Sequence, residues 1–392
     1  MPSYLTAAQT AERLGVSRAT LYAYVSRGLL HAHPGPTPRE SRYALADVEM
    51  LAGQRKRGRK PREVAKATLS WGLPVLESAI TLIEDGQLYL RGARIDTLAA
   101  SGSVEAVAAL LWQCSEASAF TAQPPPSPPL LAQGQAHLAS VRPEESLLPL
   151  FTMASEDGPT ASWQTSPERL AEGCGALVRL LAACLLGTAP ASAPLHEQCA
   201  AAWGLDDQGA DLVRMALVLC ADHELNASGF TARCVASTGA SLRAAVVGGL
   251  AALTGGLHGG ATARVEALWD ELGHAPAQAL RQRLARGEAL PGFGHHLYPE
   301  GDARARMLLG RILPAQPDWA GWIDDARGLV GQHPSLDLAL VAVRRHLGLP
   351  PGSAYGLFAL GRSLGWIAHA LEQRSGQALI RPRAAYTGPR PP

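Results

Sequence analysis

The stretch from Ala221 to Gly260 constrains this chain most, because it concentrates histidines, acids and glycines in two short motifs. It opens with Ala-Asp-His-Glu-Leu-Asn-Ala-Ser (221–228) and ends in Gly-Gly-Leu-His-Gly-Gly-Ala (255–261). Further polar motifs follow downstream: Gly-Phe-Gly-His (292–295), Ser-Leu-Asp (335–337), Arg362 and Arg381. Histidines beside glycine or acid, followed by an aspartate and arginines, indicate a site for chemistry on a polyanionic small molecule.

The charge of the chain is distributed unevenly, although its net charge is only +1. The first 62 residues carry 11 Lys and Arg against 4 Asp and Glu, a net charge of +7. The remainder carries 24 against 30, a net charge of −6. A basic front end on a mildly acidic body predicts two modules with different partners, residues 1–62 and residues 63–392.

The composition favours a globular protein of the cytoplasm. The 392 residues are 47% apolar and 18% charged, which is enough to bury a large core. No charge-free apolar run approaches the roughly 18 residues of a membrane span, and the N-terminus has no secretory pattern. Six scattered cysteines without a Cys-x-x-Cys pair predict reduced thiols rather than disulfides or a zinc site.

The first residues predict a helix-turn-helix. Thr6 and Gln9 form a capping-box pattern, and Gly15 ends the helix that follows. Ser17 can cap a second helix, over residues 18–27. Four residues suited to phosphate and base-edge contacts lie on that helix, namely Arg18, Thr20, Tyr22 and Arg27, and Arg42 further along the chain is a fifth candidate.

Residues 31–41, rich in proline and turn residues, are compatible with a wing, and Arg42 to Leu51 predicts the start of another helix. Residues 4–51 as a whole resemble a winged helix-turn-helix of the mercury-resistance-regulator and excisionase type. Double-stranded DNA is the partner that this resemblance implies, and a small protein-contact module is the alternative. The basic run 55–62 is either a phosphate-tracking arm or a solvated linker.

The body reads as nearly all helix. Residues 79–83 and 86–92 predict a short strand pair, and helical patterns follow over residues 95–112, 168–186 and 209–220. The proline run 124–129 cannot lie inside a helix.

The motifs of the body, in their order, resemble the citrate synthase family over the C-terminal four-fifths of the chain. The resemblance implies a mainly α citrate synthase fold, with a large helical domain and a smaller one at approximately residues 262–346. It also implies a homodimer, the substrates oxaloacetate and an acyl-CoA, and no metal or cofactor.

The resemblance assigns a role to each polar motif. Asp337 is the base that removes the α-proton of acetyl-CoA, His258 donates to the thioester oxygen, and His295 donates to the keto oxygen of oxaloacetate. The carboxylates of oxaloacetate are bound by His223, Arg304, Arg362 and Arg381, the last reaching the site of the partner subunit. Propionyl-CoA as the acyl donor would make the enzyme a 2-methylcitrate synthase.

Other interpretations remain open from the residues alone. Each histidine could be a packed or capping residue, and Asp337 could be a helix N-cap. His223, His258 and His295 could hold zinc, although their spacing is wide. The chain could also be a transcription regulator that uses the citrate synthase fold to sense a metabolite.

The chain departs from the family at four positions near its histidines. Thr262 and Ala263 replace the usual Asn-Glu, and His296 and Pro299 replace the usual Arg and Lys. The last two substitutions remove positive charge where the resemblance places the entrance for coenzyme A, which affects the expected acyl-CoA affinity and acyl preference.

Overall fold

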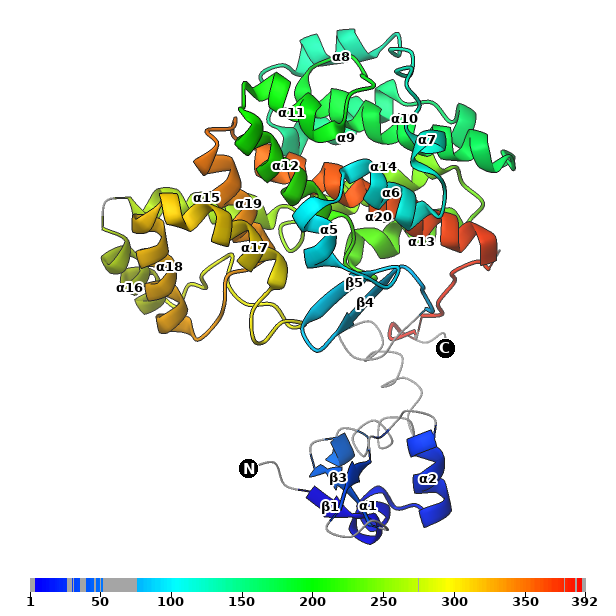
Figure 1. Cartoon of the computed structure of the whole chain (residues 1–392), viewed down its shortest axis with the longest axis vertical. Helices are drawn as coiled ribbons and strands as arrows, with labels where there is room; N and C mark the ends of the chain where they lie inside the picture. Colours follow the sequence, from blue (N-terminus) through cyan, green and yellow to red (C-terminus); the bar gives the residue numbers. More distant parts are fainter. Residues whose placement is uncertain are drawn as a thin grey trace. The chain divides into compact units, whose positions relative to one another are not determined.

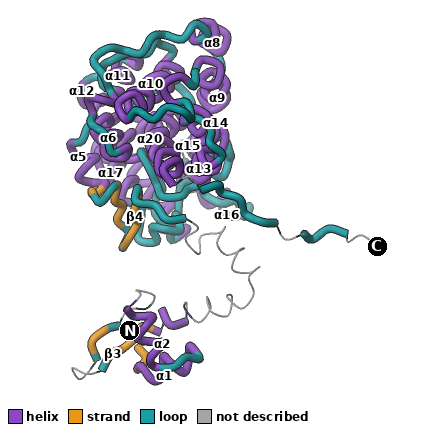
Figure 2. The backbone as a smooth tube through the Cα atoms, turned by 90° about the vertical axis from the view of Figure 1, so that its right-hand side faces the viewer, coloured by secondary structure: helices purple, strands orange, loops and turns teal. Residues whose placement is uncertain are grey.

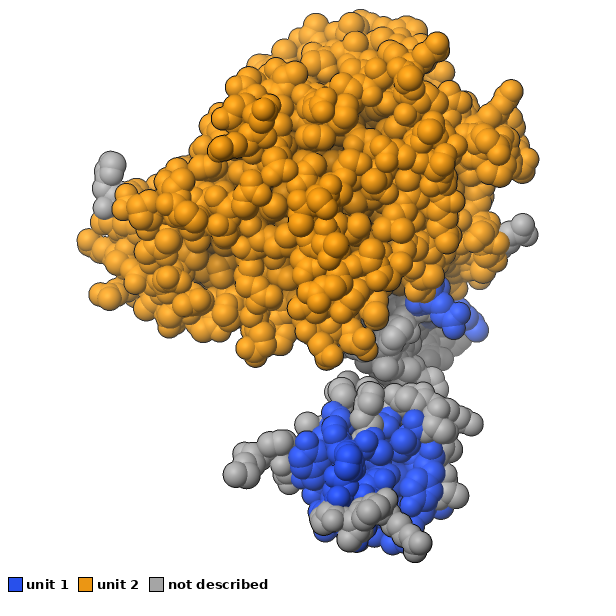
Figure 3. All heavy atoms as spheres, viewed as in Figure 1, with its two compact units in different colours: residues 1–77, 383–392 blue, residues 78–382 orange. Residues whose placement is uncertain are grey.

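The chain forms two compact units in the computed structural model (Figure 3). One comprises residues 1–77 and 383–392, and the other comprises residues 78–382. The structure describes residues 4–26, 30, 32–35, 40–45, 47–49, 51, 76–273, 275–376, 378–384 and 386–389. Arg27 and the basic run 55–62 lie outside these residues.

The first unit contains the predicted helix-turn-helix. Its elements are β1 (Tyr4–Thr6), α1 (Ala7–Leu14), α2 (Arg18–Ser26), β2 (His33–Pro34) and β3 (Ser41–Ala44). The capping box is confirmed, because Thr6 Oγ1 accepts from the N–H of Gln9 while Gln9 Oε1 accepts from the N–H of Thr6. Gly15 ends α1 with φ 62°, and Ser17 Oγ accepts from the N–H of Thr20.

The wing is a small antiparallel sheet in the order β1-β3-β2. The prediction that Arg42 and Tyr43 begin a helix is wrong, because both lie in β3; among the described residues of this stretch, helix is found at residues 45, 47–49 and 51. The central strand pairs on both edges, and its Tyr43 side chain is buried in the core of this unit beside Leu21 and Val48.

The second unit begins with the predicted strand pair. β4 (Thr81–Glu84) and β5 (Gln87–Leu90) pair antiparallel around a tight Asp-Gly turn, and β6 (Ala93–Arg94) adds a third strand. The helix predicted over residues 95–112 is instead two, α5 (Ile95–Ser101) and α6 (Val104–Trp112). Extended backbone at Gly102 ends the first, and the Ser103 side chain caps the second.

In the described remainder of this unit, the regular elements are helices joined by loops, as predicted, apart from one isolated bridge between Phe293 and Pro334 (Figure 2). α10 and α12 begin one and two residues ahead of the predicted segments. The first group of helices is α7 (Glu116–Ala119), α8 (Leu131–Leu138), α9 (Pro143–Ala154), η1 (Gly158–Thr160), α10 (Pro167–Leu186), α11 (Leu195–Trp203), α12 (Asp207–Cys220), α13 (Ala227–Ser237) and α14 (Leu242–Leu253). No helix of the described residues is long and apolar enough to cross a membrane.

The core is organised around α20 (Ser353–Gly376), whose residues 353–370 are all buried. A helix that is apolar or small on every side must be surrounded by others. α20 packs against α6, α12, α13 and α14, and Figure 1 shows it running through the middle of the unit.

Five helices follow α14 and gather at one side of the second unit (Figure 1). They are α15 (Ala261–Leu272), α16 (Pro276–Ala285), α17 (Ala303–Ile312), α18 (Pro317–Val330) and α19 (Leu336–His346), with the short η2 (Leu313–Ala315) between α17 and α18. α19 packs against α15 and α17 on one side and against α20 on the other. This group therefore adjoins the core helix along the side where the predicted site residues lie.

Candidate active site

Two neighbouring chain segments bring His295 and Asp337 to the same site. The N–H of Gly294 donates to His333 O at 2.8 Å, and the N–H of Ser335 donates to Gly292 O at 2.8 Å. Both glycines have left-handed φ angles, 87° for Gly292 and 83° for Gly294, which side chains rarely adopt. The glycines of this motif therefore fold residues 292–295 against the start of α19.

The His295 ring has a defined proton position. Its Nδ1 accepts the N–H of Leu297 at 3.2 Å, so a neutral ring carries its proton on Nε2. Burial, reinforced by the charge of Arg304, lowers the pKa of His295 to about 4. At neutral pH, His295 is therefore a neutral hydrogen-bond donor through Nε2.

Asp337 lies in the first turn of α19, after Ser335. Burial raises the pKa of its carboxyl to about 6, against the opposing effect of the Arg304 charge. Such a carboxylate is ionised at pH 7 and still basic enough to accept a proton from carbon.

His258 lies in the turn between α14 and α15, next to an exposed Leu257. Its Nε2 lies 2.7 Å from Ser228 Oγ, and its ring stands edge-on to Phe358 with centroids 5.8 Å apart. Burial, with the Arg362 charge, lowers the pKa of His258 to about 4. The glycine after it is required, because a Cβ on Gly259 would lie 2.4 Å from the Leu253 side chain.

His223 is buried beside His295, with ring centroids 5.1 Å apart. Its Nε2 lies 2.9 Å from the hydroxyl of Tyr298. Burial and the charges of Arg304 and Arg362 hold the pKa of His223 well below its usual range, so this ring is neutral as well.

Arg304 is a buried cation with a protein partner. Its Nε and Nη2 donate to the two carboxylate oxygens of Asp302 at 3.0 and 2.7 Å, and its guanidinium lies over the Tyr298 ring. Burial would lower the pKa of Arg304, but the Asp302 charge raises it overall.

Arg362 is different, because no carboxylate of the described residues lies within ion-pair distance of it. It is 1% exposed, its Nε donates to Cys220 O at 2.7 Å, and its guanidinium lies 4.7 Å from the Phe358 ring centroid. Burial lowers the pKa of Arg362 to about 10, which leaves it charged at pH 7. A buried cation of this kind favours an anionic ligand.

The structure gathers six of the seven predicted site residues around the contacts of α20 with α12 and α19 and the neighbouring start of α17. The exception is Arg381, which is exposed on the segment after α20. The residues gathered are His223, His258, His295, Arg304, Asp337 and Arg362.

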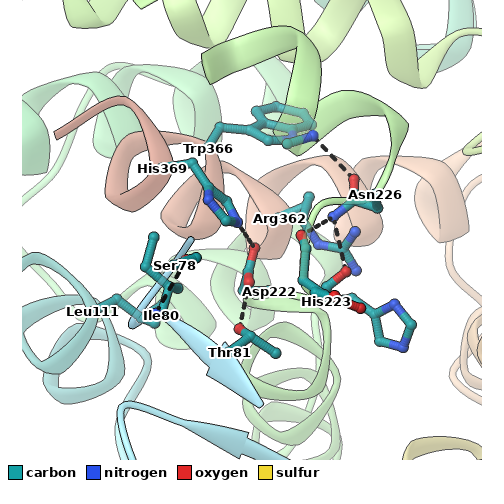
Figure 4. A network of polar contacts seen from close by, with 12 residues as sticks. Ser78, Ile80, Thr81, Leu111, Asp222, His223, Asn226, Arg362, Trp366 and His369 are labelled. Carbon is teal, nitrogen blue, oxygen red and sulfur yellow. Dashed lines mark hydrogen bonds and ion pairs between the residues drawn. The ribbon is translucent and has the colours of Figure 1, made fainter. Parts of the chain in front are cut away.

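One face of α20 contacts the segment that carries His223. Residues three and four apart lie on one helix face. Along that face Gly365 N–H donates to Ala221 O at 2.9 Å, and Trp366 Nε1 donates to Ser228 Oγ at 2.9 Å. On the same face His369 Nε2 lies 3.3 Å from Asp222 Oδ1 (Figure 4).

Sequence reasoning missed these supporting residues. The spacing of Arg362, Trp366 and His369 was a signal, because it places all three on one helix face. Asp222 and Ser228 stand in the 221–228 motif, but the motif alone gave them no role, and no local signal marked Tyr298 as a site residue.

The departures from the family lie around this site rather than in it. Thr262 is buried, and its hydroxyl donates to Gly259 O at 2.9 Å, so it supports the His258 turn. Ala263, His296 and Pro299 are exposed. No group of three metal-ligating side chains suited to a metal ion occurs among the described residues.

The candidate DNA-contacting residues lie in the first unit. Arg18 and Tyr22 are exposed on α2, where Tyr22 is 55% exposed, and Thr20 is partly exposed on the same helix. Arg42 is partly exposed on β3.

The fold and the site together define the class of protein. It is a mainly helical protein in which neutral imidazoles, a basic carboxylate and a buried arginine lie close together. The chain belongs to the citrate synthase family, because residues 68–383 match the family domain "Citrate synthase, C-terminal domain". Residues 4–56 match a helix-turn-helix domain.

Relatives of known name agree with this assignment. The citrate synthase of Haloferax volcanii is 38% identical over 195 residues, which is 46% of this chain and 50% of that protein. A 2-methylcitrate synthase of Mycobacterium tuberculosis (strain ATCC 35801 / TMC 107 / Erdman) is 38% identical over 185 residues, 44% of this chain and 47% of that protein. The chain thus spans about half the length of the curated relatives it matches.

Solved structures match over more of the chain. Citrate synthase of Thermoplasma acidophilum, in a ternary complex with carboxymethyl coenzyme A and oxaloacetate, has a TM-score of 0.69 and 25% identity, covering 82% of this chain and 95% of that one. Citrate synthase of Thermotoga maritima has a TM-score of 0.66 and 25% identity, covering 81% and 94%.

Proposed function

We propose that the protein condenses an acyl-CoA, with acetyl-CoA as the first choice, with oxaloacetate to give citrate and free coenzyme A. The observation that carries this proposal is the buried Arg362 guanidinium, which has no carboxylate within ion-pair distance among the described residues and lies near the neutral rings of His223 and His258. A planar guanidinium in a dry site is suited to a substrate carboxylate.

Oxaloacetate would bind with its carboxylates toward the arginines and the buried His223. Arg304 uses Nε and Nη2 for Asp302, which leaves Nη1 as the donor for substrate. In a homodimer, Arg381 of a second copy would complete the carboxylate site. The keto oxygen would then face Nε2 of His295, which carries the proton in the neutral ring.

Deprotonation of the acyl-CoA falls to Asp337. Its carboxylate takes a proton from the α-carbon, and the thioester oxygen gains negative charge that a donor must stabilise. His258 can donate a hydrogen bond to this oxygen through Nδ1–H in the tautomer whose Nε2 accepts a hydrogen bond from the Ser228 hydroxyl. This requires the Ser228 hydroxyl to turn from Asn226 Oδ1, to which it donates at 2.8 Å, toward His258 Nε2 at 2.7 Å.

Condensation then forms one carbon–carbon bond. The enol carbon attacks the keto carbon of oxaloacetate, and His295 donates the proton that the new alkoxide accepts. Water cleaves the resulting citryl thioester to citrate and coenzyme A. Closure around the substrates would keep water from the enol in the first step.

Propionyl-CoA is the alternative acyl donor, which would make the product 2-methylcitrate. One methylene in an apolar pocket changes discrimination only modestly, and relatives of both names are equally similar to this chain. The test is release of free thiol from the purified full chain given oxaloacetate with acetyl-CoA or with propionyl-CoA. Turnover supports the proposal and the ratio of the two rates identifies the acyl group; no thiol release with either would contradict it.

A second function is favoured by the helix-turn-helix, namely binding of double-stranded DNA through α2 with the metabolite site as a sensor. Because phosphate contacts release counterions, DNA binding should weaken about tenfold or more between about 50 and about 200 mM salt. Arg18→Ala should weaken it, whereas Arg13→Ala is the matched control, since Arg13 pairs with Glu49 at 2.7 Å. Absence of any retention of DNA at low salt would rule this function out.

A further inference from the structure

Behind His223 lies a buried polar group that the proposed chemistry does not use. Asp222 and His369 are each 0% exposed, with Asp222 Oδ1 3.3 Å from His369 Nε2. The other carboxylate oxygen accepts a hydrogen bond from the Thr81 hydroxyl at 2.5 Å (Figure 4). Burying a carboxylate costs free energy even when it is paired, so this group needs an explanation.

Asp222 keeps its charge in this position. Burial would raise the pKa of its carboxyl, but His369, Arg362 and the Thr81 hydroxyl together lower it. Glu224 also faces this charge, and burial followed by Asp222 raises the pKa of Glu224. The turn before His223 therefore contains a buried anion held by groups from a strand and a helix.

Asp222 belongs to a turn whose backbone is held by hydrogen bonds on both sides of His223. Asp222 directly precedes His223, and the next residue, Glu224, has the left-handed φ of 53°. Asn226 Nδ2 donates to both His223 O and Glu224 O, at 3.3 and 3.2 Å. On the other side, Gly365 N–H donates to Ala221 O at 2.9 Å. The backbone at His223 is thus held from both directions.

There is no free space for this turn to move toward the core helix. A Cβ on Gly365 would lie 2.3 Å from Asp222 Oδ1, and one on Gly229 would lie 3.3 Å from His369 Cδ2. At the same time the His223 ring must meet the Tyr298 hydroxyl at 2.9 Å. A shift of the turn by even about 1 Å would misplace this ring relative to a bound substrate.

We propose that Thr81, Asp222 and His369 form a positioning unit that sets His223, and with it Arg362, for binding the 2-oxo dicarboxylate substrate. This inference rests on the proposed function. Arg362 and His369 lie on the same face of α20, and the α20 face contacts residues 220–222 at Cys220 O, Ala221 O and the Asp222 carboxylate. β4, the first strand of the second unit, contributes the third member through Thr81.

Thr81→Val tests the unit most cleanly, because it removes the hydroxyl and keeps the shape of the side chain. In the full chain, the Kd and KM for oxaloacetate should rise roughly tenfold, since a hydrogen bond to a charged group is lost. The KM for acyl-CoA should stay at its wild-type value, and kcat should change far less than the KM for oxaloacetate. Thr81→Ser keeps the hydroxyl and should restore oxaloacetate affinity.

Asp222→Asn is the second variant. We expect it to lose more oxaloacetate affinity than Thr81→Val, because it removes the negative charge that faces His369 and Arg362. Asp324→Asn is the matched control, since that side chain is 67% exposed on α18. Oxaloacetate binding is measured by calorimetry and turnover by thiol release, with thermal unfolding of each variant as the folding control.

The outcomes separate the two hypotheses. Wild-type protein that neither binds oxaloacetate nor releases thiol overturns the proposed function, and the positioning role with it. Active wild type with unchanged oxaloacetate affinity in folded Thr81→Val and Asp222→Asn overturns the positioning unit alone. Equal weakening of both substrates in Thr81→Val would show general damage to the fold and would also overturn it.

Discussion

At the scale of single residues, the site depends on groups whose ordinary acidity has been changed by burial. Three imidazoles have lowered pKa values and one carboxyl has a raised pKa. Neutral imidazoles can donate a hydrogen bond without first binding a proton, and a carboxylate of raised pKa is a stronger base. This division of roles is what condensation at neutral pH requires.

The pH dependence of turnover follows from these values. Below a pH of about 6, Asp337 is protonated and cannot accept the α-proton, while His258 and His295 stay neutral down to about 4. We therefore expect kcat/KM for acyl-CoA to rise with pH and to level off above a single apparent pKa near 6. A profile that stays flat from about pH 5 to about pH 7 would exclude Asp337 as the base.

His295 offers a test of the assigned proton position. His295→Ala should lower kcat roughly a hundredfold or more, because one donor to the developing oxyanion is lost. His295→Gln, whose amide nitrogen can occupy the place of Nε2, should retain more activity than His295→Asn. Steady-state thiol release measures all three variants. A normal rate in His295→Ala would mean that another group polarises the keto oxygen.

At the scale of elements, α20 organises the site as well as the core. One face of this helix contacts residues 220–228, and the site residue Arg362 lies on the same face. Because α20 is fixed by its packing in the core, its contacts with residues 221 and 222 also fix the position of His223. Small residues on this face are required where backbone and carboxylate approach the helix closely.

Gly365→Ala should damage the site through this contact. The added Cβ would lie 2.6 Å from Ala221 O, so the turn must shift, at a cost of about 1–3 kcal/mol in unfolding free energy. Gly321→Ala on α18 is the control, because nothing lies within 4 Å of its Cβ position. Thermal unfolding and oxaloacetate affinity are the measurements, and a Gly365→Ala protein equal to Gly321→Ala in both would contradict the role of this contact.

The sequence was sufficient for the motifs, for a mainly helical body and for the helices α1, α2, α10 and α12, but not for how these elements meet. Capping residues and glycines predicted α1 and its ends, because those interactions are local. The pairing of residues 292–295 with residues 333–335 is not local, and neither is the contact of Thr81 with Asp222. The break at Gly102 was missed because helical spacing of apolar residues continues across it.

At the scale of the whole molecule, Arg381 raises the question of whether each site is built from two copies of the chain. It is exposed in the single chain, whereas the family resemblance assigns it to the site of a partner subunit. If each site uses Asp337 of one copy and Arg381 of the other, Asp337→Asn and Arg381→Ala chains should each be inactive alone. Mixed after unfolding and refolding together, they should regain activity, because one of the two sites in a mixed dimer is intact. No recovery in mixtures shown to be dimeric would place Arg381 outside the site.

The helix-turn-helix belongs to a separate unit, for which we propose a partner of its own, double-stranded DNA. Its described residues include a separate core around Leu21, Tyr43 and Val48. The proposed activities can therefore be separated by substitution, with Arg18 affecting one and Asp337 the other.

We propose that Asp337 is the base of the condensation, and this role can be examined by one paired measurement. Thiol release from acetyl-CoA and oxaloacetate is followed for wild-type and Asp337→Asn proteins, and oxaloacetate binding is measured by calorimetry on the same preparations. We predict turnover by the wild type, a loss of roughly a thousandfold or more in the variant, and nearly equal oxaloacetate affinity in both. Unchanged turnover in Asp337→Asn would exclude Asp337 as the base.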